Sequence, residues 1–179
     1  MQGMIRIIGG LLLVAVAGCA AHPTMSTAPT ARSPAPANPN LALLPPQPWP
    51  MQCVPYARQV SGIDLRGDAW TWWSQAAGRY ERGKKPRPGA VLVFKKTRAL
   101  QRGHVSVVTA IVHAREILIT HANWSSEPDT RGQVAKDVRV IDVSPGNDWS
   151  ELRVWNGSDF GKDYPAAGFI YPVATAAGA

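Results

Sequence analysis

The sequence is poor in the patterns from which metal and cofactor sites are usually built. His104, His113 and His121 are not spaced to share one helix face as a zinc site requires, and the chain has no glycine-rich phosphate-binding loop. We also find no internal repeat. We therefore expect a protein that uses no metal and no cofactor, so that ordinary side chains carry its chemistry.

The N-terminus carries an apolar run from Ile7 to Ala17, directly after Arg6. This run is too short for a comfortable membrane span and fits the core of a signal peptide. The small residues before Cys19 are typical of lipoprotein processing, so we expect a signal peptide over residues 1–18 and lipidation of Cys19. Secretory cleavage nearby is the alternative. With Ala20 rather than Asp next, we expect an exported, lipid-anchored protein on the bacterial outer membrane, facing the periplasm.

Residues 19–50 are rich in Ala, Pro, Thr, Ser and Asn. This composition cannot bury a core and predicts an extended, partly polyproline tether between the membrane and a folded domain. A domain over residues 51–173 remains, with a flexible tail at 174–179. Its length suffices for one hydrophobic core, and we expect a monomer.

Cysteine is scarce, with Cys19 and Cys53 the two in the chain. A bridge between them is not expected, because Cys19 is better explained as an anchor. A single remaining thiol in an oxidising compartment is unusual for a structural residue, although burial is a common fate of free cysteine. Cys53 is therefore a candidate nucleophile.

The neighbours of Cys53 predict a helix that begins beside it, because Pro55 fits only the first turn. The N–H groups and dipole at a helix N-terminus favour thiolate over thiol. The backbone N–H of Cys53, and more weakly the Gln52 side chain, are candidate donors to an oxyanion.

A histidine pair follows on two predicted strands. Residues 103–112 and 116–124 are rich in β-branched residues and are separated by a predicted turn at 113–115. His104 begins the first strand, and the alternation of side chains places His121 and Asn123 on one face of the second. Either of these two is able to orient the His104 ring and fix its tautomer.

Four blocks in order resemble a CHAP domain, the cysteine- and histidine-dependent amidohydrolase/peptidase branch of the papain-like, NlpC-type superfamily. The blocks are residues 52–58 (QCVPYAR), 67–69 (GDA) with Trp73, 88–94 (PGAVLVF) and 103–108 (GHVSVV). The resemblance covers about residues 50–172. It implies that Cys53 is the nucleophile and His104 the general base and acid.

The chain departs from the family at two places. Many relatives have Asp where this chain has Ala90, and Glu where it has His121. We expect His121 to orient His104, because it stands at the position of the family's usual glutamate. Asn123, Gln52 and Trp124 then lie next to the site, the last two as oxyanion or substrate-binding residues.

The order of the predicted elements indicates an α+β fold. Helices are expected near 53–60 and 67–82, and strands at 90–96, 103–112, 116–124, 135–143, 150–156 and 168–172. N-terminal helices followed by an antiparallel sheet agree with the papain-like resemblance. Trp70, Trp72 and Trp73 crowd the second helix, which has no face that holds all three. We expect at least two of them to pack against the sheet, and lining of a groove is the alternative role.

The net charge is +7, and basic residues concentrate between Arg79 and Arg102. Such a patch attracts anionic partners or is simply solvated. In an exported lipoprotein, carboxylates of peptidoglycan stem peptides or acidic lipids fit better than nucleic acid, which we do not expect as a partner.

We therefore expect a membrane-tethered cysteine amidase or endopeptidase that cuts peptidoglycan peptides through a thioester. A catalytically weak module that binds wall peptides or proteins is the main alternative, and a lipid acyltransferase of related fold is the third.

Overall fold

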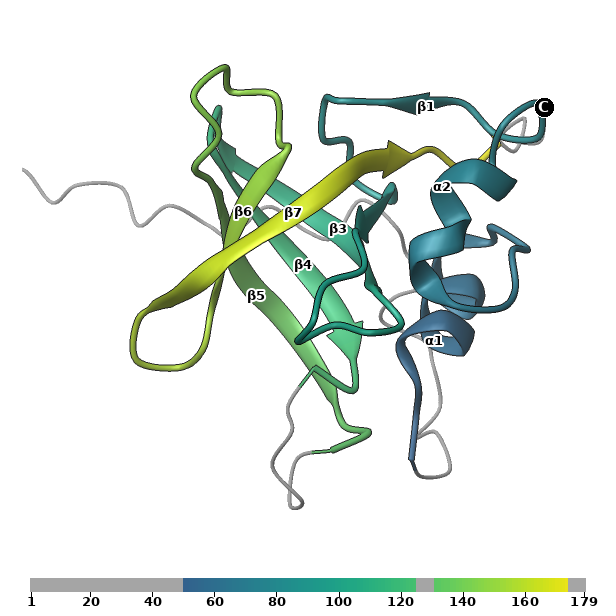
Figure 1. Ribbon diagram of the computed structural model, residues 1–179, viewed down its shortest axis with the longest axis horizontal. Helices are drawn as coiled ribbons and strands as arrows, with labels where there is room; N and C mark the ends of the chain where they lie inside the picture. The colour runs from purple at the N-terminus through teal and green to yellow at the C-terminus, as the bar shows by residue number, and fades with distance from the viewer. Residues whose placement is uncertain (1–49, 125–130, 174–179) are drawn as a thin grey trace, which may run out of the picture. The chain divides into compact units, whose positions relative to one another are not determined.

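The computed structural model describes residues 50–124 and 131–173 (Figure 1). The predicted signal peptide, Cys19, the tether up to residue 49 and the tail 174–179 lie outside the described residues. Within the described part, the helices are too short or too polar to span a membrane.

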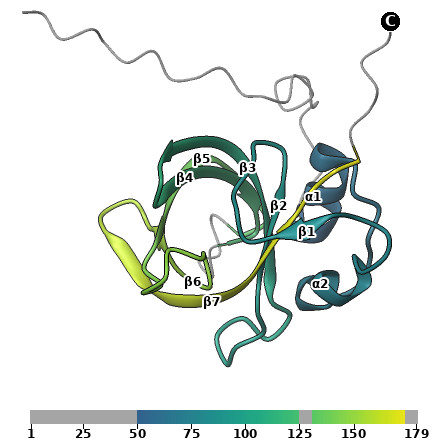
Figure 2. The same cartoon turned by 90° about the horizontal axis from the view of Figure 1, so that it is seen from above.

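The described chain is mostly β-structure. Its strands are β1 (Arg82–Gly83), β2 (Val91–Phe94), β3 (His104–His113), β4 (Glu116–Ala122), β5 (Val134–Asp142), β6 (Glu151–Trp155) and β7 (Phe160–Ile170). All pairs are antiparallel, and the long β7 pairs with both β2 and β6, which closes β2 to β7 into a barrel. Figure 2 shows these strands around a common centre, with the helices to one side.

The predicted α+β fold, with papain-like N-terminal helices followed by a sheet, is therefore wrong. The helix expected over 67–82 is reduced to a 3₁₀-helix, η2 (Ala69–Thr71), and the four-residue α2 (Trp72–Gln75). Gly67 and Gly78 lie on either side with φ of +81° and +71°, a left-handed backbone that does not continue a helix. Helical structure is therefore limited to short segments beside a closed barrel.

Closure depends on β7, of which the sequence pattern indicated only the end. The strand expected at 168–172 instead spans Phe160–Ile170. Pro165 obscured it, because proline cannot donate a ladder hydrogen bond. In the barrel, Pro165 lies opposite Glu151 of β6, and the next residue, Ala166, lies opposite Phe94 of β2. The proline thus stands where β7 changes from one partner strand to the other.

The two faces of the sheet are buried against different neighbours. Leu92 and Phe94 point into the barrel, whereas Val91 and Val93 pack outward against the helices. This accounts for the fully buried, non-alternating pattern of β2. The outer cluster includes the fully buried Trp72 and Ala57 of α1 (Cys53–Ser61), which agrees with the predicted helix at 53–60.

A close contact fixes η2 against the start of β3. Gly103 has φ of +66°, and a Cβ built there would lie 2.7 Å from Trp70 N and 2.9 Å from Phe94 O. The Trp70 N–H also donates to the Arg102 carbonyl at 3.2 Å. Only glycine permits this approach, so Gly103 determines how the segment carrying Trp70 meets the strand that begins at His104.

Replacing Gly103 tests this contact against a matched glycine. Gly78 has nearly the same φ, +71°, but open space where its Cβ would lie. We expect Gly78→Ala to lower the free energy of unfolding by about 1 kcal/mol from backbone strain alone, and Gly103→Ala by about 3 kcal/mol because overpacking adds to it. Urea denaturation at one pH measures both. Equal losses would show that the Gly103 contact with Trp70 is not tight.

Candidate active site

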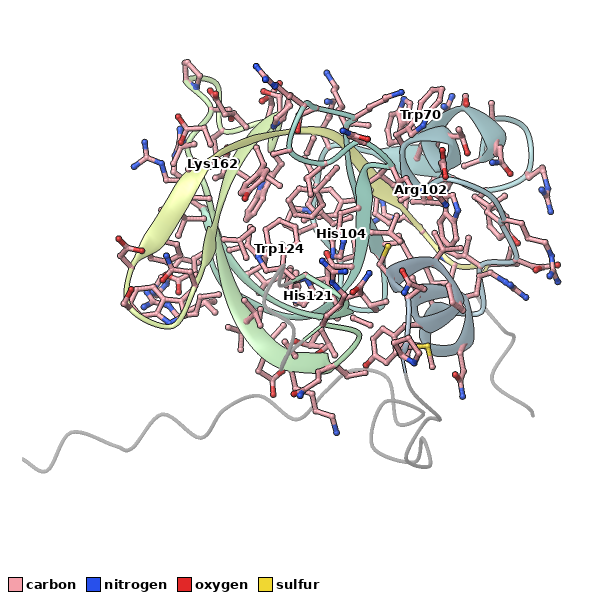
Figure 3. All side chains as sticks on the ribbon, turned by 60° about the horizontal axis from the view of Figure 1, so that its bottom comes forward. Trp70, Arg102, His104, His121, Trp124 and Lys162 are labelled. Atoms are coloured by element: carbon pink, nitrogen blue, oxygen red, sulfur yellow. The ribbon has the colours of Figure 1, made fainter. Side chains whose placement is uncertain are left out.

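The two predicted histidines meet inside one end of the barrel. His104 is the first residue of β3 and His121 the last but one of β4, so antiparallel pairing brings them together. His104 Nε2 lies 3.0 Å from His121 Nδ1, a hydrogen-bond distance. The side chains are 3% and 1% exposed. Figure 3 shows both rings within the barrel.

Aromatic rings surround the histidine pair. The Trp124 ring centroid lies 4.8 Å from that of His104 and 5.3 Å from that of His121, on which it stacks. Phe94 meets His104 edge-on at 5.7 Å, and Tyr164 contacts Trp124 at 5.1 Å. Trp124, predicted as a substrate-binding residue, thus packs on both histidines, as Figure 3 also shows. The surroundings of the pair are therefore largely apolar.

Burial determines the protonation of this pair. Desolvation lowers the pKa of His121 to about 4. Desolvation, followed by repulsion from His121, holds the pKa of His104 well below its ordinary value of 6.5. Both imidazoles are therefore neutral at pH 7, and the hydrogen bond between them needs one N–H donor and one bare nitrogen.

Cys53 is the first residue of α1, and its thiol is half-buried and unbridged. Pro55 occupies the first turn, as expected. The backbone N–H groups of Val105, Val54 and Cys53 itself lower the thiol pKa, but desolvation by burial is larger and raises it above its ordinary value of 9.0. The expected stabilisation of the thiolate is thus outweighed by burial, and Cys53 rests as a neutral thiol.

The Cys53 thiol contacts the backbone at the start of β3. A backbone N–H that hydrogen-bonds to the Cys53 sulfur belongs to Val105, the residue after His104. Helix α1 also packs along β3 and β4. The structure therefore brings Cys53 to the helix-facing side of β3 at Val105, one residue along the strand from His104, whose ring packs with His121 inside the barrel.

Asn123 has a different orientation from the one its spacing predicts. Strand β4 ends at Ala122, and Asn123 has φ of +58°, so the alternation that would have aligned it with His121 stops before it. Its Nδ2 donates to Gln52 Oε1 at 2.8 Å, and its Oδ1 accepts from the Gly132 N–H at 3.0 Å. Asn123 thus holds Gln52, the residue before the thiol.

Gly132, which no sequence motif singles out, completes this attachment. Its carbonyl accepts from the Met51 N–H at 3.0 Å. A Cβ at Gly132 would lie 2.8 Å from Pro50 Cα, so only glycine allows the segment before α1 to lie so close. A lone glycine between a loop and a strand gives no sequence signal for such a role. Together Asn123 and Gly132 fix the chain that leads to Cys53.

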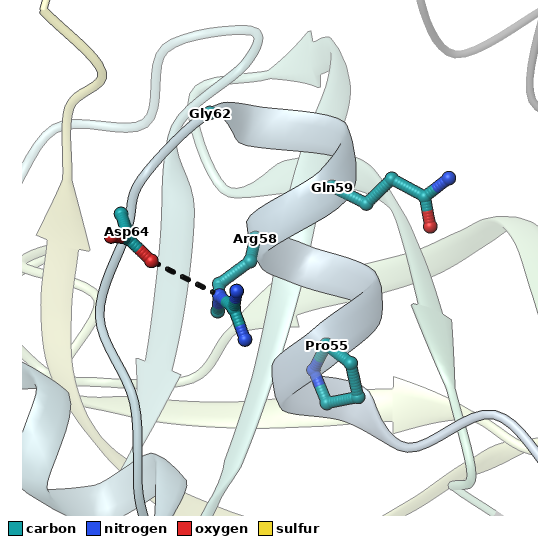
Figure 4. Close-up of a pocket in the computed structure, with 5 residues that line it drawn as sticks. All are labelled: Pro55, Arg58, Gln59, Gly62 and Asp64. Atoms are coloured by element: carbon teal, nitrogen blue, oxygen red, sulfur yellow. Dashed lines mark ion pairs between the residues drawn. The ribbon is translucent and has the colours of Figure 1, made fainter.

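A surface hollow of about 320 Å³ lies along α1 (Figure 4). Its lining residues are Pro55, Arg58, Gln59, Gly62 and Asp64. The Arg58 Nε and Asp64 Oδ1 atoms lie 3.3 Å apart across it. Neither Cys53 nor the histidines line this hollow, so we assign it no part in the chemistry. Within residues 50–124 and 131–173, no group of three or more His, Cys, Asp or Glu side chains is arranged to hold a metal ion.

The basic stretch from Arg79 to Arg102 is partly engaged in structural contacts. Arg82 donates to the Trp73 carbonyl and lies over the Trp73 ring, and Arg87 pairs with Glu81 at 2.9 Å. These cations stabilise the edge near β1. Lys96 and Arg102 lie elsewhere: Lys96 Nζ is over the Trp70 ring, and the Arg102 carbonyl accepts from the Trp70 N–H.

Comparison with known proteins identifies one family. Residues 45–123 match the family model described as the CHAP domain. The matched segment contains Cys53, His104, His121 and Asn123, and it confirms the resemblance drawn from the four sequence blocks. No curated protein matches the chain.

The buried histidines predict how stability depends on pH. An unfolded histidine binds a proton below pH 6.5, whereas folded His121 has a pKa of about 4 and the pKa of folded His104 is held well below 6.5. The unfolded state therefore gains protons first, and the free energy of unfolding falls as the pH drops through this window, by up to about 1.4 kcal/mol per pH unit for each histidine. Urea denaturation at several values between pH 7 and pH 4.5 measures this slope.

Two variants test whether the pH dependence of the free energy of unfolding comes from the His104–His121 pair. His121→Gln removes one buried imidazole and should reduce the slope. His113→Gln, which replaces an exposed histidine at the far end of β3, should leave the slope unchanged. A wild-type slope in His121→Gln would contradict the assigned protonation states.

Proposed function

Because residues 45–123 belong to the CHAP domain, an amidase/peptidase-type hydrolase family, we propose that this chain is a cysteine amidase or endopeptidase of peptidoglycan peptides. The observation that carries the proposal is the neutral, hydrogen-bonded His104–His121 pair, together with the contact between the Cys53 thiol and the backbone N–H of Val105, the residue after His104. An activated nucleophile needs a base within reach and a group that orients the base. Cys53, His104 and His121 supply these parts.

The hydrogen bond between the histidines defines which nitrogen of His104 acts as the base. His104 Nε2 hydrogen-bonds to His121 Nδ1. His104 Nδ1 is therefore the ring nitrogen left to act as the base. If His104 Nε2–H donates and His121 Nδ1 accepts, His104 Nδ1 carries a lone pair that can take the thiol proton. The opposite arrangement places a proton on His104 Nδ1 and leaves no base. The hydrogen bond thus supports His121, rather than Asn123, as the orienting residue.

The thiol and base are both neutral at rest, so proton transfer accompanies attack. His104 removes the Cys53 proton as the sulfur adds to the amide carbonyl. The resulting imidazolium gives this proton to the leaving amine, and a thioester remains. A water molecule, deprotonated by His104, then attacks the thioester and releases Cys53 with its proton restored.

Gln52 is the side-chain donor proposed for the oxyanion. Its Oε1 accepts from Asn123 Nδ2, which orients the amide, and Nε2 is the donor of this side chain. The Gln52 side chain is exposed, as a group that meets substrate must be. A donor held in place before the reaction stabilises developing charge without reorganisation cost. Asn123 thus acts through Gln52 rather than through His104.

The compartment and partners follow from the N-terminal sequence. We propose that residues 1–18 direct export, that Cys19 carries the lipid anchor, and that residues 19–50 let the domain reach the cell wall from the outer membrane. Peptidoglycan stem peptides are then the nearest abundant amides. The positive net charge of +7 suits their carboxylates.

One observation favours a second function. The raised pKa of Cys53 makes the resting thiol a poor nucleophile, which also suits a catalytically weak module that binds wall peptides. In that case the site would bind wall peptides without cleaving them. Only an assay of cleavage separates these two functions.

Digestion of purified peptidoglycan tests the proposal directly. Mass spectrometry of released muropeptides should show new amine termini with the wild-type chain, and Cys53→Ala should reduce their formation at least about a thousandfold. We expect a loss of about a hundredfold for His121→Ala, which removes the orienting group, and of less than about tenfold for Asn123→Ala. Intact sacculi and muropeptides under reducing conditions would contradict the hydrolase and favour the binding module. A larger loss in Asn123→Ala would overturn the assignment of His121.

A further inference from the structure

Trp70 is the large aromatic side chain that the fold leaves in solvent close to the candidate site. It is 43% exposed, whereas Trp72 is fully buried two residues later. A single exposed aromatic ring is common on protein surfaces, and this one offers an apolar face that a ligand can cover. The Gly103 contact described above holds the Trp70 backbone against the residue before His104. The ring is therefore fixed beside the start of β3.

Lys96 lies beside this ring, and Arg102 meets the Trp70 backbone. Lys96 Nζ lies 5.8 Å from the Trp70 ring centroid. The Arg102 carbonyl accepts the Trp70 N–H, and its guanidinium, 87% exposed, lies 3.6 Å from Asp68 Oδ1. Figure 3 shows Trp70 and Arg102 at the same side of the barrel as His104. An exposed pair at this distance is worth little, so Arg102 remains available to another anion.

These positions agree with a substrate-binding surface next to the chemistry. The Val105 N–H hydrogen-bonds to the Cys53 thiol. The Trp70 backbone packs against Gly103, and its N–H donates to the Arg102 carbonyl. The Trp70 backbone and the Cys53 thiol therefore each contact the chain within the segment 102–105, at the start of β3. An aromatic surface with Lys96 beside it and the exposed Arg102 on the adjoining segment fits a ligand that has both apolar groups and carboxylates.

We propose that Trp70, Lys96 and Arg102 form a subsite for the carboxylate-bearing stem peptide of the substrate. Arg102 and Lys96 bind a free carboxylate of the peptide, and the Trp70 ring packs against the adjoining alkyl groups. This inference rests on the proposed peptidoglycan function and names the part of the substrate that the enzyme distinguishes. It predicts that the protein prefers muropeptides with free carboxylates to the same muropeptides with amidated carboxylates.

Binding to these two ligands tests the subsite without requiring cleavage. The full chain carrying Cys53→Ser is titrated calorimetrically with a soluble muropeptide and with its amidated counterpart. We expect the free acid to bind about tenfold more tightly, as two charge-assisted contacts allow. In the Lys96→Ala/Arg102→Ala variant the two ligands should bind equally. Trp70→Ala should weaken both about fivefold and keep the preference.

Matched variants control for net charge and for loss of exposed apolar surface. Lys85→Ala/Arg87→Ala removes the same charge from the same basic stretch near β1, and Ile111→Ala removes a side chain that is 45% exposed at the far end of β3. Both controls should keep wild-type affinity and preference.

The outcomes distinguish failure of the subsite proposal from failure of the hydrolase proposal. If the preference survives Lys96→Ala/Arg102→Ala, or is lost equally in Lys85→Ala/Arg87→Ala, the subsite is wrong and the hydrolase proposal stands. If the chain binds neither muropeptide and the wild-type chain releases no products from the wall, the proposed function itself fails. If cleavage occurs with equal KM for both ligands, carboxylate recognition is excluded while catalysis is confirmed.

Discussion

Strand β7 hydrogen-bonds to β6 along its first half and to β2 along its second, and the other features of the domain depend on this double pairing. A closed sheet of this size has an interior just wide enough for side chains. Residues at the starts and ends of strands are therefore enclosed when a neighbour covers the barrel end. His104 and His121 are enclosed in this way, beside Trp124.

Enclosure explains the electrostatics of the site. In water two histidines and a thiol would titrate near their ordinary values, and an ion pair between them would be easy to form. Here burial disfavours every charged form, so the pKa of each histidine is lowered and that of Cys53 is raised. The resulting site is neutral at rest and develops charge only when the thiol proton moves. A substrate that excludes the remaining water and supplies an oxyanion to Gln52 would make this transfer favourable.

The sequence predicts the local elements well where a single pattern determines them. Strands β3 and β4 and the turn between them follow from their β-branched residues, and the neighbouring positions of His104 and His121 follow from that hairpin. Helix α1 follows from Pro55 and the residues after Cys53. These predictions depend on short-range geometry.

The features that sequence reasoning missed depend on contacts between distant segments. Pro165 hides β7, whose partners are far away in the chain, so closure of the barrel and the mostly β fold were not foreseen. The left-handed conformation of Asn123 results from its bonds to Gln52 and Gly132. The direction of the Cys53 pKa shift likewise depends on how deeply the whole fold buries the helix N-terminus.

In the proposed mechanism His104 is a neutral base whose Nε2–H is donated to His121. Long-range ¹H–¹⁵N NMR of the imidazole nitrogens at neutral pH tests it most directly, with His104→Gln and His121→Gln variants used for assignment. We expect a protonated Nε2 and an unprotonated Nδ1 on His104, together with an unprotonated Nδ1 on His121. A proton on His104 Nδ1 in the resting protein would contradict it, because that tautomer cannot accept the proton of Cys53.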